Sequence, residues 1–148
     1  MVEELKGNKK ENMTFKDIIA WQKAYEFVLM TYKVTRKFPD YERYGLASQF
    51  QRAAVSITAN IAEGYKKLSI ADKLRFLNIA QGSLEECRFY IMLSRDLDYI
   101  SSEEHDELNH SLEGASVYLN AYCKGIRENS SSNSSVSTAK SQHNSSEQ

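Results

Sequence analysis

Four stretches of the chain carry apolar side chains at alternating steps of three and four residues, which is the spacing of one face of an α-helix. The stretches cover residues 15–37, 44–67, 69–97 and 102–127, and only short connections separate them. Short connections make consecutive helices antiparallel neighbours. The pattern therefore predicts an all-α fold, an antiparallel up-down-up-down four-helix bundle.

Residues with capping chemistry stand at the predicted helix ends. Ser101 and Glu104 have the spacing of a capping box at the start of the fourth helix. Thr14 can cap the first helix in the same way. Pro39 should end that helix, because proline disfavours a helical conformation at the residue before it.

The apolar stripes indicate which side chains should face the core. In the first helix the expected stripe is Ile18, Trp21, Tyr25, Val28, Tyr32 and Thr35. The third helix has the stripe Leu77, Ala80, Leu84, Cys87, Ile91 and Ser94, with a second stripe beside it formed by Phe76, Ile79, Tyr90, Leu93 and Leu97. This double arc is broader than a bundle core needs, so a second buried surface such as a subunit contact is expected.

Aromatic residues fall into two groups. Those at helical spacing are expected in the core: Trp21, Tyr25, Tyr32, Phe50, Tyr118 and Tyr122. Tyr41, Tyr44 and Tyr65 lie near helix ends beside basic residues, where they can stack on unpaired bases or fill a subunit contact.

The two ends of the chain differ from the middle in composition. Residues 1–12 mix charges without an apolar period and are expected to be flexible. Residues 129–148 hold nine serines and almost no apolar side chains, which predicts a disordered Ser/Asn-rich tail. The four-helix bundle is therefore expected over residues 13–128.

The overall composition excludes several classes of protein. One proline and six glycines in 148 residues are too few for the turns of an all-β fold. No run of about 18 apolar residues predicts a membrane span, and no apolar signal-peptide core is present. Cys87 and Cys123 show no CxxC spacing and read as core residues. A soluble protein in the cytoplasm is expected.

Several consecutive motifs carry a resemblance to a known family. They are Phe15-Lys16-Asp17, Trp21-Gln22-Lys23-Ala24, Arg43-Tyr44-Gly45-Leu46, Ser48-Gln49, Arg52-Ala53-Ala54-Val55-Ser56-Ile57, Asn60-Ile61-Ala62-Glu63-Gly64, Arg75-Phe76-Leu77, Ile79-Ala80, Gly82-Ser83-Leu84-Glu85-Glu86 and Asp96-Leu97. In this order, over residues 14–127, they closely resemble the bacterial four-helix bundle proteins of the 23S ribosomal RNA intervening-sequence family.

The resemblance implies a four-helix bundle, a homopentameric assembly and no catalytic activity. Some family members are encoded inside insertions of large-subunit ribosomal RNA genes. More distantly, the chain is similar to the accessory variability determinants of diversity-generating retroelements, which are pentameric bundles that bind nucleic acid and a reverse transcriptase. Those relatives are strongly basic, whereas this chain has a formal net charge of −1.

The charge is distributed unevenly along the chain. Residues 13–82 hold 11 Lys/Arg against 6 Asp/Glu, a net charge of +5, and residues 83–128 hold 4 against 10, a net charge of −6. Clustered cations bind phosphates. The candidate nucleic-acid-binding residues are Lys16, Lys23, Lys33, Arg36, Lys37, Arg52, Lys66 and Lys67. The alternative is a solvated face or ion pairs between subunits.

A polar ribbon runs along the second helix beside its apolar stripe. It consists of Arg52, Ser56, Asn60 and Glu63. Buried polar groups need partners, so a structural polar network is expected. In it Arg52 pairs with an acid, Asn60 bonds to a neighbouring helix, and Glu63 is held by a nearby cation or by backbone donors. A small-ligand or RNA site on this ribbon is the alternative. Gly64 is expected to permit close packing.

An enzyme is not supported. A di-metal bundle needs two Glu-x-x-His motifs, and this chain has one, at Glu107 and His110. Three histidines are too few for a histidine cluster, and no phosphate-binding loop or nucleophile elbow is present. We expect no catalytic residue, metal or cofactor.

The predicted function is that of a non-catalytic homo-oligomer, expected to be a pentamer, that associates with RNA or DNA or serves a protein that handles nucleic acid. The alternative is a protein-interaction scaffold that binds no nucleic acid.

Overall fold

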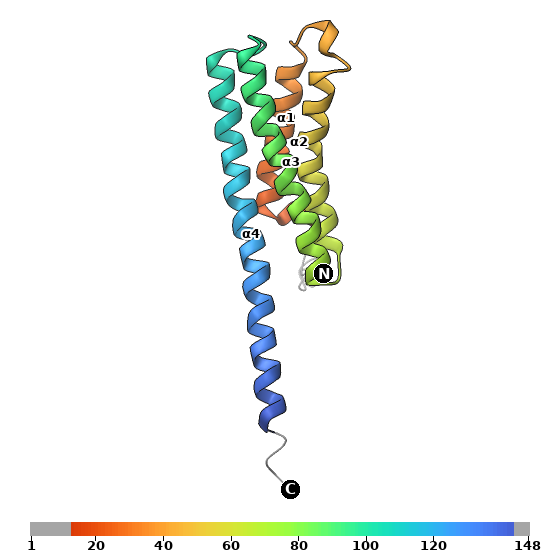
Figure 1. Cartoon of the computed structure of the whole chain (residues 1–148), viewed down its shortest axis with the longest axis vertical. Helices are drawn as coiled ribbons and strands as arrows, with labels where there is room; N and C mark the ends of the chain where they lie inside the picture. The colour runs from red at the N-terminus through yellow and green to blue at the C-terminus, as the bar shows by residue number, and fades with distance from the viewer. Residues whose placement is uncertain (1–12, 144–148) are drawn as a thin grey trace, which may run out of the picture.

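The computed structural model describes residues 13–143, with side chains described as far as residue 134. Four long helices, α1 (Ile19–Thr35), α2 (Leu46–Lys66), α3 (Ile70–Asp96) and α4 (Ser102–His143), follow one another along the chain. Short 3-10 helices lie at Phe15–Asp17 (η1) and Asp40–Glu42 (η2). The described residues contain no strand, which confirms the all-α four-helix bundle (Figure 1).

Each helix packs against its neighbours in sequence, and α4 closes the bundle by packing against α1. The α1–α2 and α3–α4 connections lie at one end of the bundle, and the α2–α3 connection lies at the other (Figure 1). The core consists mainly of aliphatic and aromatic side chains from all four helices. Its largest fully buried members are Phe27, Phe50, Ile57, Ile61, Leu77, Ile91, Leu108, Leu112 and Leu119.

The core-facing side of α1 matches the predicted stripe only in part. Ile18, Val28 and Thr35 are buried as predicted. The core also takes five residues that the predicted stripe did not include: Ala20, Ala24, Phe27, Thr31 and Val34. Tyr25 and Tyr32 are 45% and 37% exposed. The helix carries two apolar stripes, and the one with alanines lets neighbouring helices approach closely. The stripe of rings lies at the surface, where Trp21 stacks on Tyr25 with centroids 5.1 Å apart.

Two buried threonines do not disturb this core. The Thr31 hydroxyl donates to the Phe27 carbonyl at 2.9 Å, and the Thr35 hydroxyl donates to the Thr31 carbonyl at 2.8 Å. Each buried donor is therefore satisfied within α1.

The α1 helix also begins later than predicted. Thr14 and Asp17 do form a capping box, but it caps η1, because Ile18 has an extended conformation with φ −76° and ψ 118°. The helix then starts at Ile19.

The α3 helix matches the prediction for its first stripe, all of which is buried. The second stripe is divided. Phe76, Tyr90 and Leu93 are partly buried, whereas Ile79 and Leu97 are 47% and 45% exposed. Phe89 and Met92 are exposed on the outer side of the same helix. A subunit contact on this face stays a prediction.

Close packing of α2 on α3 depends on Gly64. A Cβ atom at this position would lie 3.3 Å from the Lys73 carbonyl oxygen and 3.3 Å from the Phe76 Cβ atom. These distances are shorter than ordinary van der Waals contacts, so a side chain here would push the two helices apart. The prediction that Gly64 permits close packing agrees with this geometry.

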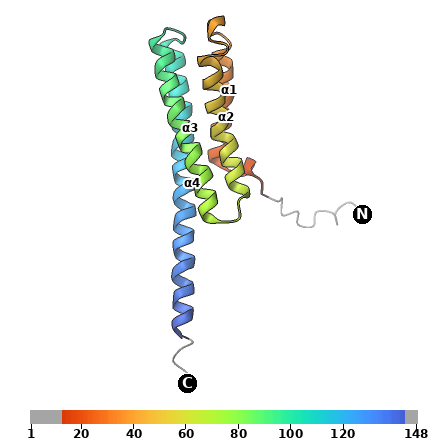
Figure 2. The ribbon, with the colours of Figure 1, turned by 45° about the vertical axis from the view of Figure 1, so that its right-hand side comes forward.

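The α4 helix is longer than predicted. The sequence predicted a disordered tail from residue 129, whereas α4 continues to His143, well past the other three helices (Figure 2). No proline or glycine interrupts residues 129–143. The hydroxyls of Ser131 and Ser132 donate to the carbonyls four residues earlier, at 3.2 and 3.0 Å, so they bond within the helix instead of competing with it.

The predicted flexible segment 1–12 lies outside the described residues, as does the last part of the tail, residues 144–148. None of the described helices combines the length and the apolar character needed to cross a membrane.

Candidate nucleic-acid interface

The antiparallel helices place six of the eight predicted binding residues at opposite ends of the bundle and the other two, Lys23 and Arg52, along its body. Lys33, Arg36 and Lys37 lie where α1 ends, and Lys66 and Lys67 lie where α2 ends. The 21 residues of α2 separate these groups by about 30 Å at a rise of 1.5 Å per residue. The eight residues therefore do not form one surface.

The end that holds the α1–α2 and α3–α4 connections is acidic. Its residues 33–43 and 95–107 hold five Lys/Arg against eight Asp/Glu, a net charge of −3, and we call it the acidic end. Lys37 forms an ion pair with Glu104 of α4. Lys33 and Lys37 also line a hollow between α1 and α4 together with Glu103, Glu104 and Glu107. Acidic neighbours thus offset these cations.

The opposite end is basic. Its residues 14–17, 63–75 and 124–128 hold seven Lys/Arg against four Asp/Glu, a net charge of +3, and we call it the positive end. Lys16 belongs to it because the Tyr65 hydroxyl, near the end of α2, donates to the Met13 carbonyl at 2.7 Å. The α4 extension also leaves the bundle at this end (Figures 1 and 2).

Two lysines of the positive end have no side-chain partner among the described residues. They are Lys16 and Lys66, and both are exposed. Lys67 keeps its charge at the surface, with its Nζ atom 4.6 Å from the centre of the Phe76 ring. Cations without carboxylate partners remain able to pair with phosphates.

Lys73 also lies at this end, although it was not in the predicted binding set. Its Nζ atom donates to the Tyr65 carbonyl at 2.7 Å and to the Gly64 carbonyl at 3.4 Å. The ammonium group therefore caps the last turn of α2, where a cation also complements the helix dipole. The signal was its place in the first turn of α3, a few residues after Lys66 and Lys67.

Lys23 and Arg52 belong to neither end. Lys23 lies 3.8 Å from Glu26 within α1. Arg52 is exposed on α2 and has no hydrogen bond or ion pair to another described residue. Both lie along the body of the bundle, outside the positive end.

The polar ribbon of α2 forms a smaller network than predicted. The Ser83 hydroxyl of α3 donates to the Ser56 hydroxyl at 2.8 Å, and the Asn60 amide donates to the Ser56 hydroxyl at 3.0 Å. The predicted partners of Arg52 and Glu63 are absent within the described part of the chain, where both side chains are exposed. The network therefore links α2 to α3 through Ser56 alone.

A groove of about 460 Å³ lies between α2 and α3 beside this network. Arg52 and Ser56 line it from α2, and Ser83, Glu86 and Tyr90 line it from α3. Burial and the adjacent Glu86 carboxylate raise the pKa of the Tyr90 hydroxyl, which donates to Gln49 Oε1 at 3.3 Å or to Glu86 Oε2 at 3.4 Å. The charged residues of the groove lining are one arginine, Arg52, and one glutamate, Glu86, so the groove is not a cluster of cations.

A second hollow, of about 330 Å³, lies at the α1–α2 connection, and we call it the end pocket. Its lining is formed by Thr35, Arg36, Phe38, Pro39, Asp40, Arg43, Ala47 and Gln51. Arg36 belongs to the predicted set, but Arg43 does not. Sequence spacing gave no indication that the η2 turn would bring these two arginines to one hollow.

The aromatic candidates have different surroundings. The Tyr41 hydroxyl lies 3.3 Å from the Tyr99 hydroxyl, and Tyr65 bonds to the Met13 carbonyl, so both have structural contacts. Tyr44 is 90% exposed. It lies at the acidic end, so the basic residues of the positive end do not surround it.

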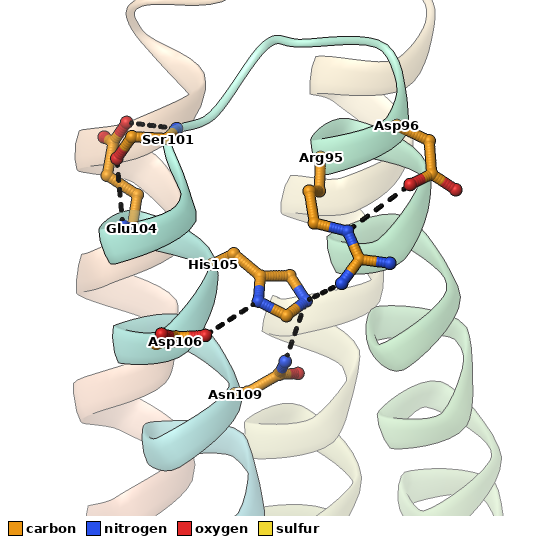
Figure 3. A network of polar contacts seen from close by, with 7 residues as sticks. All are labelled: Arg95, Asp96, Ser101, Glu104, His105, Asp106 and Asn109. Carbon is orange, nitrogen blue, oxygen red and sulfur yellow. Dashed lines mark hydrogen bonds and ion pairs between the residues drawn. The ribbon is translucent and has the colours of Figure 1, made fainter.

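A polar network fixes the α3–α4 connection (Figure 3). The Nε2 atom of His105 lies 3.2 Å from Arg95 Nη1 and 3.0 Å from Asn109 Nδ2. Both neighbours are donors, so Nε2 accepts and the proton of the neutral ring lies on Nδ1, 3.0 Å from Asp106 Oδ1. This histidine therefore has a structural role.

Two features of the described residues concern metal and cysteine chemistry. No group of three or more His, Cys, Asp or Glu side chains there is placed to hold a metal ion. Cys87 is buried, and desolvation raises the pKa of its thiol far above the usual range, so the nucleophilic thiolate is strongly disfavoured.

Comparison with known proteins decides the family. The family described as 23S rRNA-intervening sequence protein matches residues 16–121. The chain belongs to this family. A crystal structure of a protein of unknown function from the S23 ribosomal protein family of Bacteroides thetaiotaomicron VPI-5482 superposes with a TM-score of 0.67 at 25% identity, covering 74% of this chain and 98% of that one. No curated protein matches the chain. The resemblance stated from the motifs is confirmed.

Proposed function

We propose that this 23S rRNA-intervening sequence protein is a non-catalytic homo-oligomer that associates with RNA through its positive end. The observation that carries the proposal is the net charge of +3 at that end, where Lys16 and Lys66 have no carboxylate partner among the described residues. Phosphate binding needs such free cations. Of the eight predicted binding residues, the proposed surface keeps Lys16, Lys66 and Lys67. Lys73 is added to them.

Oligomerisation follows from the apolar side chains that the bundle leaves at its surface. Tyr25, Leu29 and Tyr32 are exposed on α1, and Ile79 and Phe89 are exposed on α3. Large apolar side chains exposed on helix faces are typical of protein contacts. These faces run along the sides of the bundle, so copies that associate through them in parallel place their positive ends together.

Parallel association explains how a chain of net charge −1 can bind a polyanion. Each subunit contributes only a few cations, but a closed ring, for which we propose five subunits, repeats the patch. Linked weak sites raise the overall affinity without new contacts. The same face can hold RNA for a protein that handles nucleic acid, and a cytoplasmic location suits that role.

The test is a salt titration of single-stranded RNA binding, followed by fluorescence anisotropy. The variant Lys16→Glu/Lys66→Glu reverses two cations of the positive end, and Lys23→Glu/Lys33→Glu makes the same change of charge elsewhere on the bundle. Each phosphate contact on single-stranded RNA contributes about −0.7 to the log–log salt slope, so the first variant should flatten the slope by about 1.4 for each subunit in contact. The control should stay near the wild-type slope.

Equal loss of binding in the two variants would contradict the assignment to the positive end. Wild-type binding that does not change with salt would contradict an electrostatic interface altogether.

A protein-interaction scaffold is the second candidate, and the exposed apolar residues of α1 and α3 favour it. In that case the positive end of one assembly meets the acidic end of another. Purified protein with no excess absorbance at 260 nm and no gel shift at low salt would favour the scaffold over RNA association.

A further inference from the structure

The end pocket has the chemistry of an anion site that is independent of the positive end. Two arginines line it, Arg36 at the end of α1 and Arg43 just after η2. Neither side chain has a hydrogen bond or an ion pair with any described residue. Arginine presents several N–H donors in a planar fork, which matches the oxygens of a phosphate group.

The rest of the lining adds polar and apolar contacts. The Gln51 amide donates to the Thr35 hydroxyl at 2.9 Å, which fixes its orientation and leaves its second N–H hydrogen for a ligand. Phe38 and Pro39 supply an apolar wall. A volume of about 330 Å³ is at the lower end of the range for small-molecule pockets, large enough for a phosphate and part of the group that carries it.

The start of α2 lies beside the pocket, because Ala47, its second residue, belongs to the lining. No side chain caps this helix start, and its first turn contains no acidic residue. Its free backbone N–H groups and the helix dipole add positive potential on this side. They add to the two arginines, which define the site.

The charges also limit the size of the ligand. Asp40 is the acidic member of the lining, so the pocket carries a net charge of +1 within an end whose net charge is −3. A long polyanion would meet the carboxylates of the α3–α4 connection. A small phosphate ester enters the pocket alone, and charges beyond about 8 Å are screened at physiological salt.

We propose that the end pocket binds the phosphate group of a small phosphomonoester, held between Arg36 and Arg43 with the esterified group against Phe38 and Pro39. A phosphomonoester carries close to two negative charges at pH 7, which two guanidinium groups match. The proposal does not depend on RNA association, because the pocket and the positive end lie at opposite ends of the bundle.

The experiment is isothermal titration calorimetry of the full chain with three probes: adenosine monophosphate, adenosine and inorganic phosphate. We expect binding of adenosine monophosphate, no binding of adenosine, and weaker binding of inorganic phosphate, which lacks the group that contacts the apolar wall. If inorganic phosphate binds as tightly as adenosine monophosphate, the pocket recognises free phosphate and the assignment to an ester is wrong. If none of the three binds, or if adenosine binds as tightly as its phosphate, the proposal is overturned.

Two variants of the end pocket should change its affinity for adenosine monophosphate in opposite directions. Arg43→Gln removes one charge-assisted contact and should weaken binding about tenfold or more. Asp40→Asn removes the repelling carboxylate and should strengthen binding severalfold. Arg52→Gln is the matched control, since Arg52 is also an unpartnered arginine beside a hollow but lies outside the end pocket. Far-ultraviolet circular dichroism confirms the fold of each variant, and equal affinity in Arg43→Gln and Arg52→Gln would contradict the proposal.

Discussion

Glu104 connects the start of α4 to the end of α1, and its replacement by glutamine tests how charge stabilises the bundle. Its carboxylate accepts from the Ser101 backbone N–H at 3.1 Å, while the Glu104 N–H donates to the Ser101 hydroxyl at 3.0 Å. The same carboxylate forms an ion pair with Lys37. The hydrogen bond from Lys37, and then the backbone bond from Ser101, lower the pKa of Glu104 below its usual range.

The variant Glu104→Gln keeps the size and the capping geometry but removes the charge. The Lys37 side chain is 60% exposed and the Glu104 side chain 23% exposed, so solvent screens the pair, which should contribute about 0.5–1 kcal/mol. The lost interaction with the helix dipole adds about 0.3–1 kcal/mol. We therefore expect a loss of about 1–2 kcal/mol in the free energy of unfolding at pH 7.

The pH dependence follows from the sign of the pKa shift. The folded-state pKa of Glu104 lies below its unfolded value, so the charge stabilises the protein above the unfolded pKa, and this contribution is lost as the pH falls through the folded pKa. Relative to wild type, the penalty of Glu104→Gln should therefore shrink below about pH 4.

Urea denaturation followed by circular dichroism at 222 nm measures this penalty. Glu103→Gln is the control, because Glu103 is exposed in the same turn and has no hydrogen bond or ion pair to the described residues. A double-mutant cycle with Lys37→Gln isolates the pair. The reasoning is refuted if Glu104→Gln and Glu103→Gln have the same stability at pH 7, or if the Glu104→Gln penalty is unchanged at pH 3.

Three other predictions concern the core and the ends of the chain. Because burial disfavours its thiolate, Cys87 should react with a thiol reagent at pH 8 only after denaturation, and stoichiometric reaction of the native protein would contradict this. Gly64→Leu should lower the free energy of unfolding by about 1–3 kcal/mol, because the new side chain forces α2 away from α3. Gly82 has open space around it, so Gly82→Leu should not have this cost. Equal urea midpoints for the two variants would show that α2 and α3 do not approach tightly at Gly64. Deleting residues 129–148 should lower the circular dichroism signal of helix but change the free energy of unfolding by less than about 0.5 kcal/mol. A larger loss of stability would mean that the α4 extension packs on the bundle.

The four helices could be predicted from the sequence because the apolar stripes and caps that indicate a helix are local features. The stripe of α3 and the capping box at Ser101 act within one or two turns, and both are present in the structure. The core-facing side of α1 was predicted only in part: Val28 and Thr35 are buried, but two stripes compete, and tight packing favoured Ala24 and Phe27 over the larger ring of Tyr25. Ring size alone does not show which stripe allows a close approach.

The α4 extension was missed for a related reason. A composition rich in serine predicts that a segment cannot bury enough surface to offset its ordering entropy. In the structure the segment instead continues a helix that the bundle has already nucleated, so it avoids the costly first turn. Nucleation by preceding residues is not visible in the composition of the segment itself.

The candidate site was predictable only in part. Counting charges along the chain identified cations such as Lys16 and Lys66, but not which of them share one end. The antiparallel arrangement brings Lys16 near the end of α2 and sets Lys37 against Glu104 of α4, 67 positions away in sequence. Pairing between distant segments thus decides which cations stay free, and neither the end pocket nor the contribution of Arg43 could be predicted without it.

Ultraviolet crosslinking of the assembled protein to a uridine-rich single-stranded RNA, followed by mass spectrometry of the peptides, tests the central claim most directly. The account predicts crosslinks in peptides that contain residues 14–17 and 63–75, and few in those that contain residues 33–43. Crosslinks concentrated in residues 33–43 or in 95–107 would contradict the account.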